Sequence, residues 1–439
     1  MTERRYCEVT LNKKFLLCNI LFSVLFLAAY SINRNIMILA AVIPCVFILF
    51  TNELSFCIAE LLFLLPFSVT LTISMGTTSL FMLPKLALIV RFLIFNKGKI
   101  GSKVFVGLIF LFLYSIIVNL FKTGFPLVRV INLLLWFFIA YLIIKSLKTG
   151  RDMVIACSAF VGGVILSGVI GLLKGLFPNL SSELISAQYL NEDSGDLVQR
   201  FAGLWNDPNG YTAFLICALF AAYWLLKNRK IKVILFSVLA VTTTALGILT
   251  LSKSCALLLV GFWIYFLLSN QGMGFVKKVG AVVLIGALCI LGASFYTNEL
   301  SELIYRFTSA GGESFNLSSL TTHRSTIWSD YLREIFNGDF FFGFGIDAPL
   351  VGGYACHNTY LQLLYEWGMV GITVYLITWI AVIRQPSFNR TNIVAVLFLL
   401  VTIFFISCTY IEFLYFLLPF MICIGRVKSD EKTYILSTV

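Results

Sequence analysis

The chain has 439 residues, of which 59% are hydrophobic and only 12% are charged. A soluble domain could not bury so much apolar surface, and the same composition excludes a disordered chain and a secreted disulfide-rich domain. The net charge of +11 does not indicate nucleic-acid binding, because the 32 Lys and Arg residues stand in small groups between long apolar runs. The composition therefore predicts an all-α polytopic membrane protein.

Apolar runs long enough to cross a bilayer follow one another along the chain, and we expect about 12–14 transmembrane helices of roughly 20 residues each. The runs place these spans at residues 15–31, 36–50, 55–74, 79–95, 104–121, 128–144, 153–173, 208–226, 231–251, 255–269, 279–296, 357–382, 392–407 and 410–425.

The charges between the spans predict which side each loop faces. With the N-terminus inside, 21 of the 32 Lys and Arg residues fall in inside loops, as the positive-inside rule requires. Both termini are then cytoplasmic, and two long acidic loops lie outside, so the chemistry is expected on the outer face. The chain divides into N-terminal helices (1–173), a first periplasmic loop (174–207), central helices (208–296), a large periplasmic loop with an interfacial helix (297–356), and C-terminal helices with a cytoplasmic tail (357–439).

A charged residue inside a span is costly and usually functional, and Lys85 lies in the span 79–95. Lys85 could line a cavity, or it could form a buried structural pair with Glu60, and the sequence leaves both open. Two His residues and 11 Cys residues without ligand spacing give no expected metal site. Most of the cysteines are expected to be small buried apolar residues, among them Cys18, Cys45, Cys157, Cys217, Cys289 and Cys423.

Two cations stand at the outer ends of the central spans. Arg200 precedes Asp207-Pro208, where Asp207 is a suitable N-cap and Pro208 a suitable first residue of the next helix. Lys253 lies in a tight outer turn between two spans.

The second long loop contains a segment with helical spacing of apolar residues. We expect a helix over residues 322–336, ended by Asn337-Gly338 and lying along the outer interface. Arg324 lies in its first turn, and a lone Arg at this place usually contacts a lipid phosphate. The apolar face of the expected helix consists of Ile327, Trp328, Tyr331, Leu332, Ile335 and Phe336.

His357 begins a span from the outer side. The field of a helix N-terminus attracts phosphate and disfavours imidazolium, so His357 is expected to be neutral and able to accept a proton. The competing explanation is a histidine that caps a water-exposed helix end. Glu366 lies half a turn away from His357 on the same helix and is expected to be a buried structural acid near the close packing at Gly368 and Gly371.

Arg200, Lys253, Arg324 and His357 are all predicted at the outer membrane edge. Several cations at that depth suit a lipid-linked phosphate.

These segments resemble the O-antigen ligase/polymerase superfamily of bacterial envelope glycan enzymes. The run from His357-Asn-Thr to Gly371 looks like the signature of that family. The segments Arg324–Trp328 and Phe342–Gly345 are similar to its Arg-x-x-x-Trp and Gly-x-Gly elements. Arg200-Phe-Ala-Gly203 with Asp207-Pro-Asn209 matches a further pattern, and the resemblance covers roughly residues 198–425.

The resemblance implies a GT-C-like, metal-independent glycosyltransferase without a cofactor, which lies in the bacterial inner membrane with its active site facing the periplasm. Its donor would be an undecaprenyl-diphosphate-linked glycan, with His357 as general base and Arg324 as a diphosphate ligand. Ligases of the family have Arg where this chain has Lys253, which keeps the charge but cannot bind phosphate with two parallel hydrogen bonds. The segment around Arg200 is more like that of polymerases.

We therefore expect an O-antigen or capsular polysaccharide polymerase that joins lipid-linked repeat units by inverting transfer. Arg200, Arg324 and Lys253 would hold the diphosphate. The expected partners are the lipid-linked donor and acceptor, the bilayer, a chain-length regulator and a flippase, and no nucleic acid. One alternative is a ligase that transfers glycan to lipid A–core or to a protein. A lipid-linked oligosaccharide flippase is less favoured, because flippases of this kind are built from two related halves with short loops.

Overall fold

The computed structural model describes most of the chain, in two compact units that are treated separately below. Unit 1 contains residues 1–98, 146–303 and 424–439, and unit 2 contains residues 99–145 and 304–423. The described residues are 7–10, 13–73, 79–95, 101–122, 126–177, 180, 188–190, 197–205, 207–228, 230–269, 279–280, 283, 286, 324–383, 390–406, 411–424 and 434–437.

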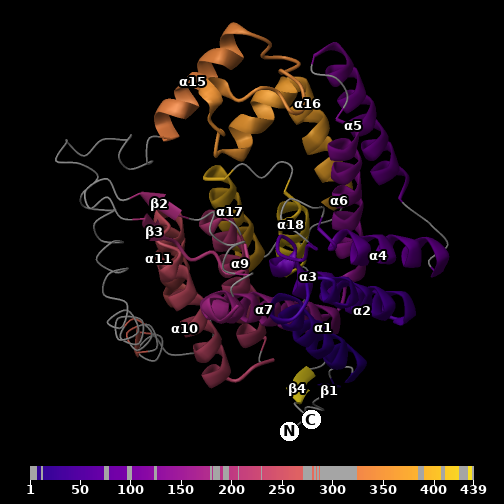
Figure 1. Ribbon diagram of the computed structural model, residues 1–439, viewed down its shortest axis with the longest axis vertical. Helices are drawn as coiled ribbons and strands as arrows, with labels where there is room; N and C mark the ends of the chain where they lie inside the picture. Colours follow the sequence, from indigo (N-terminus) through magenta and orange to yellow (C-terminus); the bar gives the residue numbers. More distant parts are fainter. Residues whose placement is uncertain are drawn as a thin grey trace. The chain divides into compact units, whose positions relative to one another are not determined.

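Unit 1 is a bundle of helices (Figure 1). Short 3-10 turns extend α3 and α7, namely η1 (Leu65–Phe67) and η2 (Leu173–Leu176). The α-helices are α1 (Lys13–Ser31), α2 (Ile36–Phe50), α3 (Leu54–Leu64), α4 (Met82–Phe95), α7 (Gly150–Leu172), α9 (Pro208–Lys227), α10 (Val233–Leu249) and α11 (Lys253–Leu268).

The core of unit 1 is built around α9, in which every residue from Pro208 to Leu226 is buried. Close approaches of the backbone bring α7 against its neighbours. A Cβ atom on Gly163 would lie only 2.2 Å from the carbonyl oxygen of Phe63 on α3. Small residues of this kind allow helices to pack closely in a membrane, where lipid gives no hydrophobic drive for association.

Two pairs of short strands accompany the helices of unit 1. β1 (Cys7–Thr10) pairs in parallel with β4 (Tyr434–Ser437), and β2 (Gln188–Leu190) pairs antiparallel with β3 (Leu197–Gln199). The β1–β4 pair holds the two ends of the chain together (Figure 1). The predicted topology needs both ends on one side, while the choice of side stays a prediction.

Unit 2 is formed from two segments that are far apart in the sequence (Figure 1). The first supplies α5 (Ser102–Phe121) and almost all of α6 (Leu127–Ser146). The second supplies α15 (Arg324–Asn337), the 3-10 turn η4 (Val351–Gly353), α16 (Thr359–Ile383), α17 (Arg390–Phe404) and α18 (Phe413–Ile424).

Aromatic and glycine contacts join these two segments. Phe137 of α6 packs between Trp379 of α16 and Tyr415 of α18, with ring centroids 4.9 Å and 5.1 Å away. α5 packs along α16, and a Cβ on Gly371 would lie 2.5 Å from the ring of Tyr114. The close packing expected at Gly371 is thus confirmed, with α5 as the partner helix.

The chain is a polytopic α-helical membrane protein. Six of its described helices, α1, α5, α6, α7, α9 and α16, are long and apolar enough to cross a membrane, and six further apolar helices are shorter. Each predicted span coincides with a helix except residues 279–296, which lie almost wholly outside the described residues. Of the cysteines expected in the apolar interior, Cys18, Cys157, Cys217 and Cys423 are buried, Cys45 is half-buried, and Cys289 lies outside the described residues.

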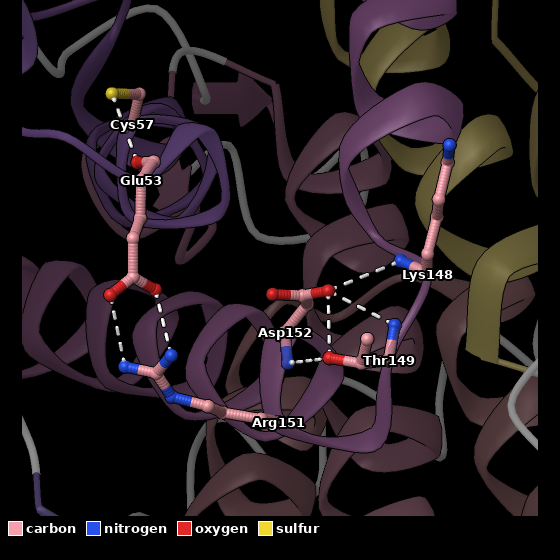
Figure 2. A network of polar contacts seen from close by, with 6 residues as sticks. All are labelled: Glu53, Cys57, Lys148, Thr149, Arg151 and Asp152. Atoms are coloured by element: carbon pink, nitrogen blue, oxygen red, sulfur yellow. Dashed lines mark hydrogen bonds and ion pairs between the residues drawn. The ribbon is translucent and has the colours of Figure 1, made fainter.

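The start of α7 shows how a predicted cytoplasmic turn is fixed (Figure 2). Thr149 and Asp152 form a capping box, in which the hydroxyl of Thr149 accepts from the amide of Asp152 and the carboxylate accepts from the amide of Thr149. Two guanidinium nitrogens of Arg151 bind the two carboxylate oxygens of Glu53, at N–O distances of 2.9 Å and 3.1 Å. Both side chains are more than 40% exposed, so the pair orients the ends of α3 and α7 more than it stabilises them.

Candidate functional site

His357 lies outside the helix that it was expected to begin. It precedes α16 by two residues, its side chain is exposed, and its backbone has a φ of +49°, a left-handed conformation that is uncommon for a residue other than glycine. Such conformations cluster at functional sites when neighbouring groups hold them in place.

The polar cap of α16 belongs to Asn358, not to His357. The Asn358 side-chain oxygen accepts from the backbone amides of Tyr360 and Leu361 at 3.0 Å and 3.1 Å. The capping explanation for His357 is therefore wrong, because the neighbouring residue already satisfies these amides.

α15 holds the segment that carries His357. The indole N–H of Trp328 donates to the carbonyl of Cys356 at 2.9 Å, and the hydroxyl of Tyr331 donates to the carbonyl of Tyr354 at the same distance. Burial raises the pKa of Tyr331 to about 12, so this hydroxyl keeps its proton as a donor. Two side chains of one helix thus fix the backbone on the N-terminal side of His357.

The helix expected over residues 322–336 is confirmed as α15, with Gly338 donating to the carbonyl of Glu334 after its last residue. Its apolar face is only partly buried. Tyr331 and Ile335 are in the core of this region, whereas Leu332 and Phe336 are 39% and 66% exposed. The spacing located the helix correctly. However, only part of its apolar face is packed against the rest of unit 2.

Arg324 and the start of α16 are tied to the same end of α17. A guanidinium nitrogen of Arg324 donates to the carbonyl of Phe405 at 3.0 Å, and the hydroxyl of Thr359 donates to the carbonyl of Ile406. Phe404 packs edge-on against Trp328 at 5.1 Å. In unit 2, the start of α15, which carries Arg324, and the start of α16, which follows His357, therefore both contact the end of α17.

Arg200 and Lys253 come together in unit 1. Arg200 donates through Nε to the carbonyl of Thr250 at 3.1 Å, three residues before Lys253. Ser252 is the N-cap of α11, so Lys253 is the first residue of that helix. Both cations are half-buried beside a helix N-terminus, which is a suitable place for an anion.

The predicted start of the span after Arg200 is confirmed. Asp207 is the N-cap of α9, its side chain accepts from the amide of Asn209 at 2.9 Å, and Pro208 is the first helical residue. Asn209 in turn accepts from the hydroxyl of Ser252 at 2.7 Å, which joins the start of α9 to the cap of α11.

The four predicted site residues thus form two pairs, one in each unit. Arg200 and Lys253 belong to unit 1, and Arg324 and His357 belong to unit 2. A single site containing all four stays a prediction.

The Gly-rich segment after α15 forms hydrogen bonds with the backbone of α16 where that helix is interrupted. The sequence did not reveal this role. Gly368 has φ +60° and ψ −176°, so the helical hydrogen bonds cannot continue through it. The segment at residues 340–345 replaces them. Phe344 and Gly345 donate to the carbonyls of Tyr365 and Glu366, and the amides of Met369 and Val370 donate to the carbonyls of Phe340 and Phe341.

The two glycines at this repair have no room for a side chain. A Cβ on Gly343 would lie 2.6 Å from the backbone of Glu366, and one on Gly368 would lie 2.4 Å from the carbonyl oxygen of Phe341. Both also have φ values near +60° to +70°, which only glycine adopts without strain. The Gly-x-Gly pattern and Gly368 are the sequence features that could have indicated this contact. Neither feature shows that the two segments form hydrogen bonds with each other.

Side chains near the end of α5 and the start of α6 bind the residues on either side of the segment 340–345. Lys122 binds Asp339 at 2.7 Å, Arg129 forms an ion pair with Asp347, and the Asn119 side chain accepts from the amide of Ile346 at 2.8 Å. Partial burial acts to raise the pKa of Asp339, but hydrogen bonds from Lys122 and from the amide of Phe342 outweigh it and hold the pKa below its usual range. Asp339 therefore remains a carboxylate that can hold the segment.

Cys356 is the thiol next to His357, and it is not available as a nucleophile. It is 3% exposed, and burial raises the pKa of its thiol to about 12. Covalent catalysis by a Cys–His pair is therefore not supported here.

Glu366 and Lys85 are both buried, at 6% exposure. Glu366 accepts from the side-chain amide of Gln362 at 3.0 Å and lies two residues before the break at Gly368. The ammonium of Lys85 lies 5.0 Å from the ring centroid of Phe81, and no ion pair joins Lys85 to Glu60. The structural pair suggested for Lys85 is therefore not formed, and its role stays a prediction.

Among the residues that the structure describes, no group of three or more His, Cys, Asp and Glu side chains is placed to hold a metal ion. Comparisons with protein-family models, with curated proteins and with solved structures gave no match.

Proposed function

We propose that the chain is a membrane glycosyltransferase that polymerises undecaprenyl-diphosphate-linked O-antigen or capsular repeat units. The observation that supports this most is the placement of His357. An exposed imidazole is held in a strained backbone conformation by α15, and Arg324, the first residue of that helix, is bonded to the same end of α17 as the start of α16.

In the proposed reaction, His357 accepts the proton of a sugar hydroxyl on the lipid-linked acceptor. The hydroxyl oxygen forms a bond to the anomeric carbon of the donor as the bond from that carbon to the diphosphate oxygen breaks, which inverts the configuration. Arg324, with Arg200 and Lys253, balances the charge that develops on the leaving undecaprenyl diphosphate. The cations are supplied by the protein, so the mechanism proposed here uses no metal and no cofactor.

The proposed fold is GT-C-like, and the proposed location is the bacterial inner membrane with the site facing the periplasm. Exposed aromatic side chains near His357, of which Tyr354 is 65% exposed, suit sugar rings as stacking surfaces. A chain-length regulator and a flippase are the partners that this role requires.

The test is the set of glycans in a strain that lacks the chain. A polymerase binds two lipid-linked glycans, so its loss should leave a single repeat unit on lipid A–core or on the equivalent final carrier. A ligase binds one lipid-linked donor and the final carrier, so its loss should leave long polymer on undecaprenyl diphosphate and a bare core. Long stranded chains would reject the polymerase in favour of the ligase.

Complementation with His357→Ala tests the chemistry that both activities share. We expect no polymer at near-normal protein level, because an exposed side chain outside the helix contributes little to folding. Full polymer length and amount with this variant would remove the proposed general base.

A further inference from the structure

Glu60 is a carboxyl buried in the helical core of unit 1. It lies on α3 with 0% of its surface exposed. The thiol of Cys18 on α1 donates to Oε1 at 3.6 Å, and thiols are weak donors. Oε2 is also buried, and none of the described residues donates a hydrogen bond to it.

None of the described residues forms an ion pair that compensates this carboxyl. On α4, Arg91 donates through Nε to the carbonyl of Thr51 at 2.8 Å, and the ammonium of Lys85 lies over the ring of Phe81. The described residues contain no ion pair with Glu60. The titratable or charged residues on the helices that pack against α3, and on α3 itself besides Glu60, are Lys13, Lys14, Cys18, Tyr30, Cys45, Cys57, Lys85, Arg91, Arg151, Asp152 and Cys157.

The remaining groups in that set are engaged elsewhere, uncharged or exposed. Arg151 pairs with Glu53, and Asp152 belongs to the capping box of α7 (Figure 2). Cys45 and Cys57 donate to the carbonyls of Ala41 on α2 and of Glu53, the residue before α3. On α1, the hydroxyl of Tyr30 donates to the carbonyl of Thr70, and Lys13 and Lys14 are exposed. An ionised Glu60 would therefore be an isolated charge in an apolar interior, which is strongly unfavourable in a membrane protein.

Asn19 supplies the complementary group. It is 8% exposed, its amide nitrogen donates to the carbonyl of Phe15 at 3.0 Å, and its side chain interacts with the carboxyl of Glu60. Its Oδ1 atom is buried and, like Oε2 of Glu60, receives no hydrogen bond from the described residues. A proton on Oε2 would make that atom a donor and would give Oδ1 a partner.

We propose that Glu60 is a proton-binding site within the helical core of unit 1, with its carboxyl in the acid form at neutral pH and its proton donated to Oδ1 of Asn19. This site is independent of the glycan transfer proposed above, and neither proposal depends on the other. Glu53 provides an internal comparison, because it stands seven residues earlier beside α3 and is an exposed carboxylate paired with Arg151.

Infrared difference spectroscopy on the full-length protein in lipid bilayers tests this directly. In the wild type minus Glu60→Gln difference at neutral pH, we expect the carbonyl stretch of a protonated carboxyl, above the amide I band. The matched control, wild type minus Glu53→Gln, should show the two stretching bands of a carboxylate instead. Carboxylate bands in the Glu60 difference would overturn the proposal.

Asn19→Ala tests the proposed acceptor. The carbonyl band of Glu60 should move to higher wavenumber, because a free acid carbonyl is stiffer than one whose hydroxyl is hydrogen-bonded. An unchanged band would reject Asn19 as the acceptor. Should Glu60→Gln fail to fold, ¹³C at the glutamate side-chain carboxyls of Glu366→Gln decides the question, because this variant lacks the other buried glutamate among the described residues. An isotope-shifted acid band then supports the site, and its absence overturns it.

Discussion

The turns before α11 and α16 have the same backbone conformation, but their strained residues differ in exposure. Leu251 and His357 each have φ +49°, each is followed by a polar N-cap, Ser252 or Asn358, and each helix begins at the next residue. Leu251 is fully buried, and the cation Lys253 comes two residues later. At α16 the strained residue is itself the exposed imidazole.

The difference shows what each strained residue contributes. Strain at Leu251 is offset by burial of its side chain, so that turn is stabilised by its own packing. The His357 side chain is exposed, so other residues must hold the turn, and Trp328 and Tyr331 of α15 do so. Strain that is maintained from outside is typical of functional sites.

Glycine substitutions at both turns should separate these roles most strongly. Glycine adopts a positive φ freely, so His357→Gly should retain the melting temperature of the wild type and lose all polymer. Leu251→Gly should lose about 2–4 kcal/mol of stability, because the loss of a buried leucine exceeds the relief of strain. Thermal melting in detergent and glycan blots measure both. A strongly destabilised His357→Gly would mean that His357 has a packing role.

Arg324→Lys keeps the positive charge at the start of α15 but removes the planar guanidinium that, in the proposed mechanism, would bind a diphosphate with two hydrogen bonds. We expect a loss on the order of 2–4 kcal/mol of transition-state stabilisation, by comparison with a lost oxyanion donor. Polymerisation rates with purified lipid-linked substrate measure this loss. Full activity in Arg324→Lys would reduce Arg324 to an anchor between α15 and the end of α17.

Trp328→Phe tests whether α15 holds the His357 turn. Removal of the indole donor to Cys356 should cost about 1 kcal/mol, expressed as a roughly five-fold lower rate with little change in substrate KM. Trp136→Phe is the matched control, because the Trp136 Nε1 is buried and has no hydrogen-bond partner among the described residues. Equal effects of the two variants on rate would show that only general packing is involved.

Lys253→Arg should have the smallest effect. If Lys253 binds phosphate at the start of α11, an arginine at this half-buried position keeps the charge and restores the ligase-like residue. We expect polymer of wild-type amount in complemented cells, whereas Lys253→Gln should lower it. Equal polymer with all three residues would remove Lys253 from the substrate site.

The sequence predicted the helices well because hydropathy and cap residues act locally. The apolar runs located the spans, and Asp207-Pro208 gave the first residue of α9. The same local rules could not choose between His357 and Asn358 as the cap of α16, since both are polar residues beside a helix start. They also gave no sign that Gly368 breaks the helix, because a glycine in an apolar run usually marks close packing.

Long-range contacts were inaccessible for a related reason. The bond from Trp328 to Cys356 and the ion pair between Lys122 and Asp339 join residues whose proximity depends on the whole of unit 2. The suggested pairing of Lys85 with Glu60 was chemically reasonable, but the packing of α3 and α4 did not bring the two side chains together.

The hydrogen bonds from the segment 340–345 to the broken α16 constrain the length of that segment. Its amides and carbonyls must meet those of residues 365, 366, 369 and 370 in a fixed order. An inserted or deleted residue would leave several of these groups without partners, although a point substitution of a side chain such as Phe341, which is 63% exposed, would not. Homologous chains should therefore vary freely in sequence at the exposed positions of this segment, while the number of residues between Asp339 and Gly345 stays constant.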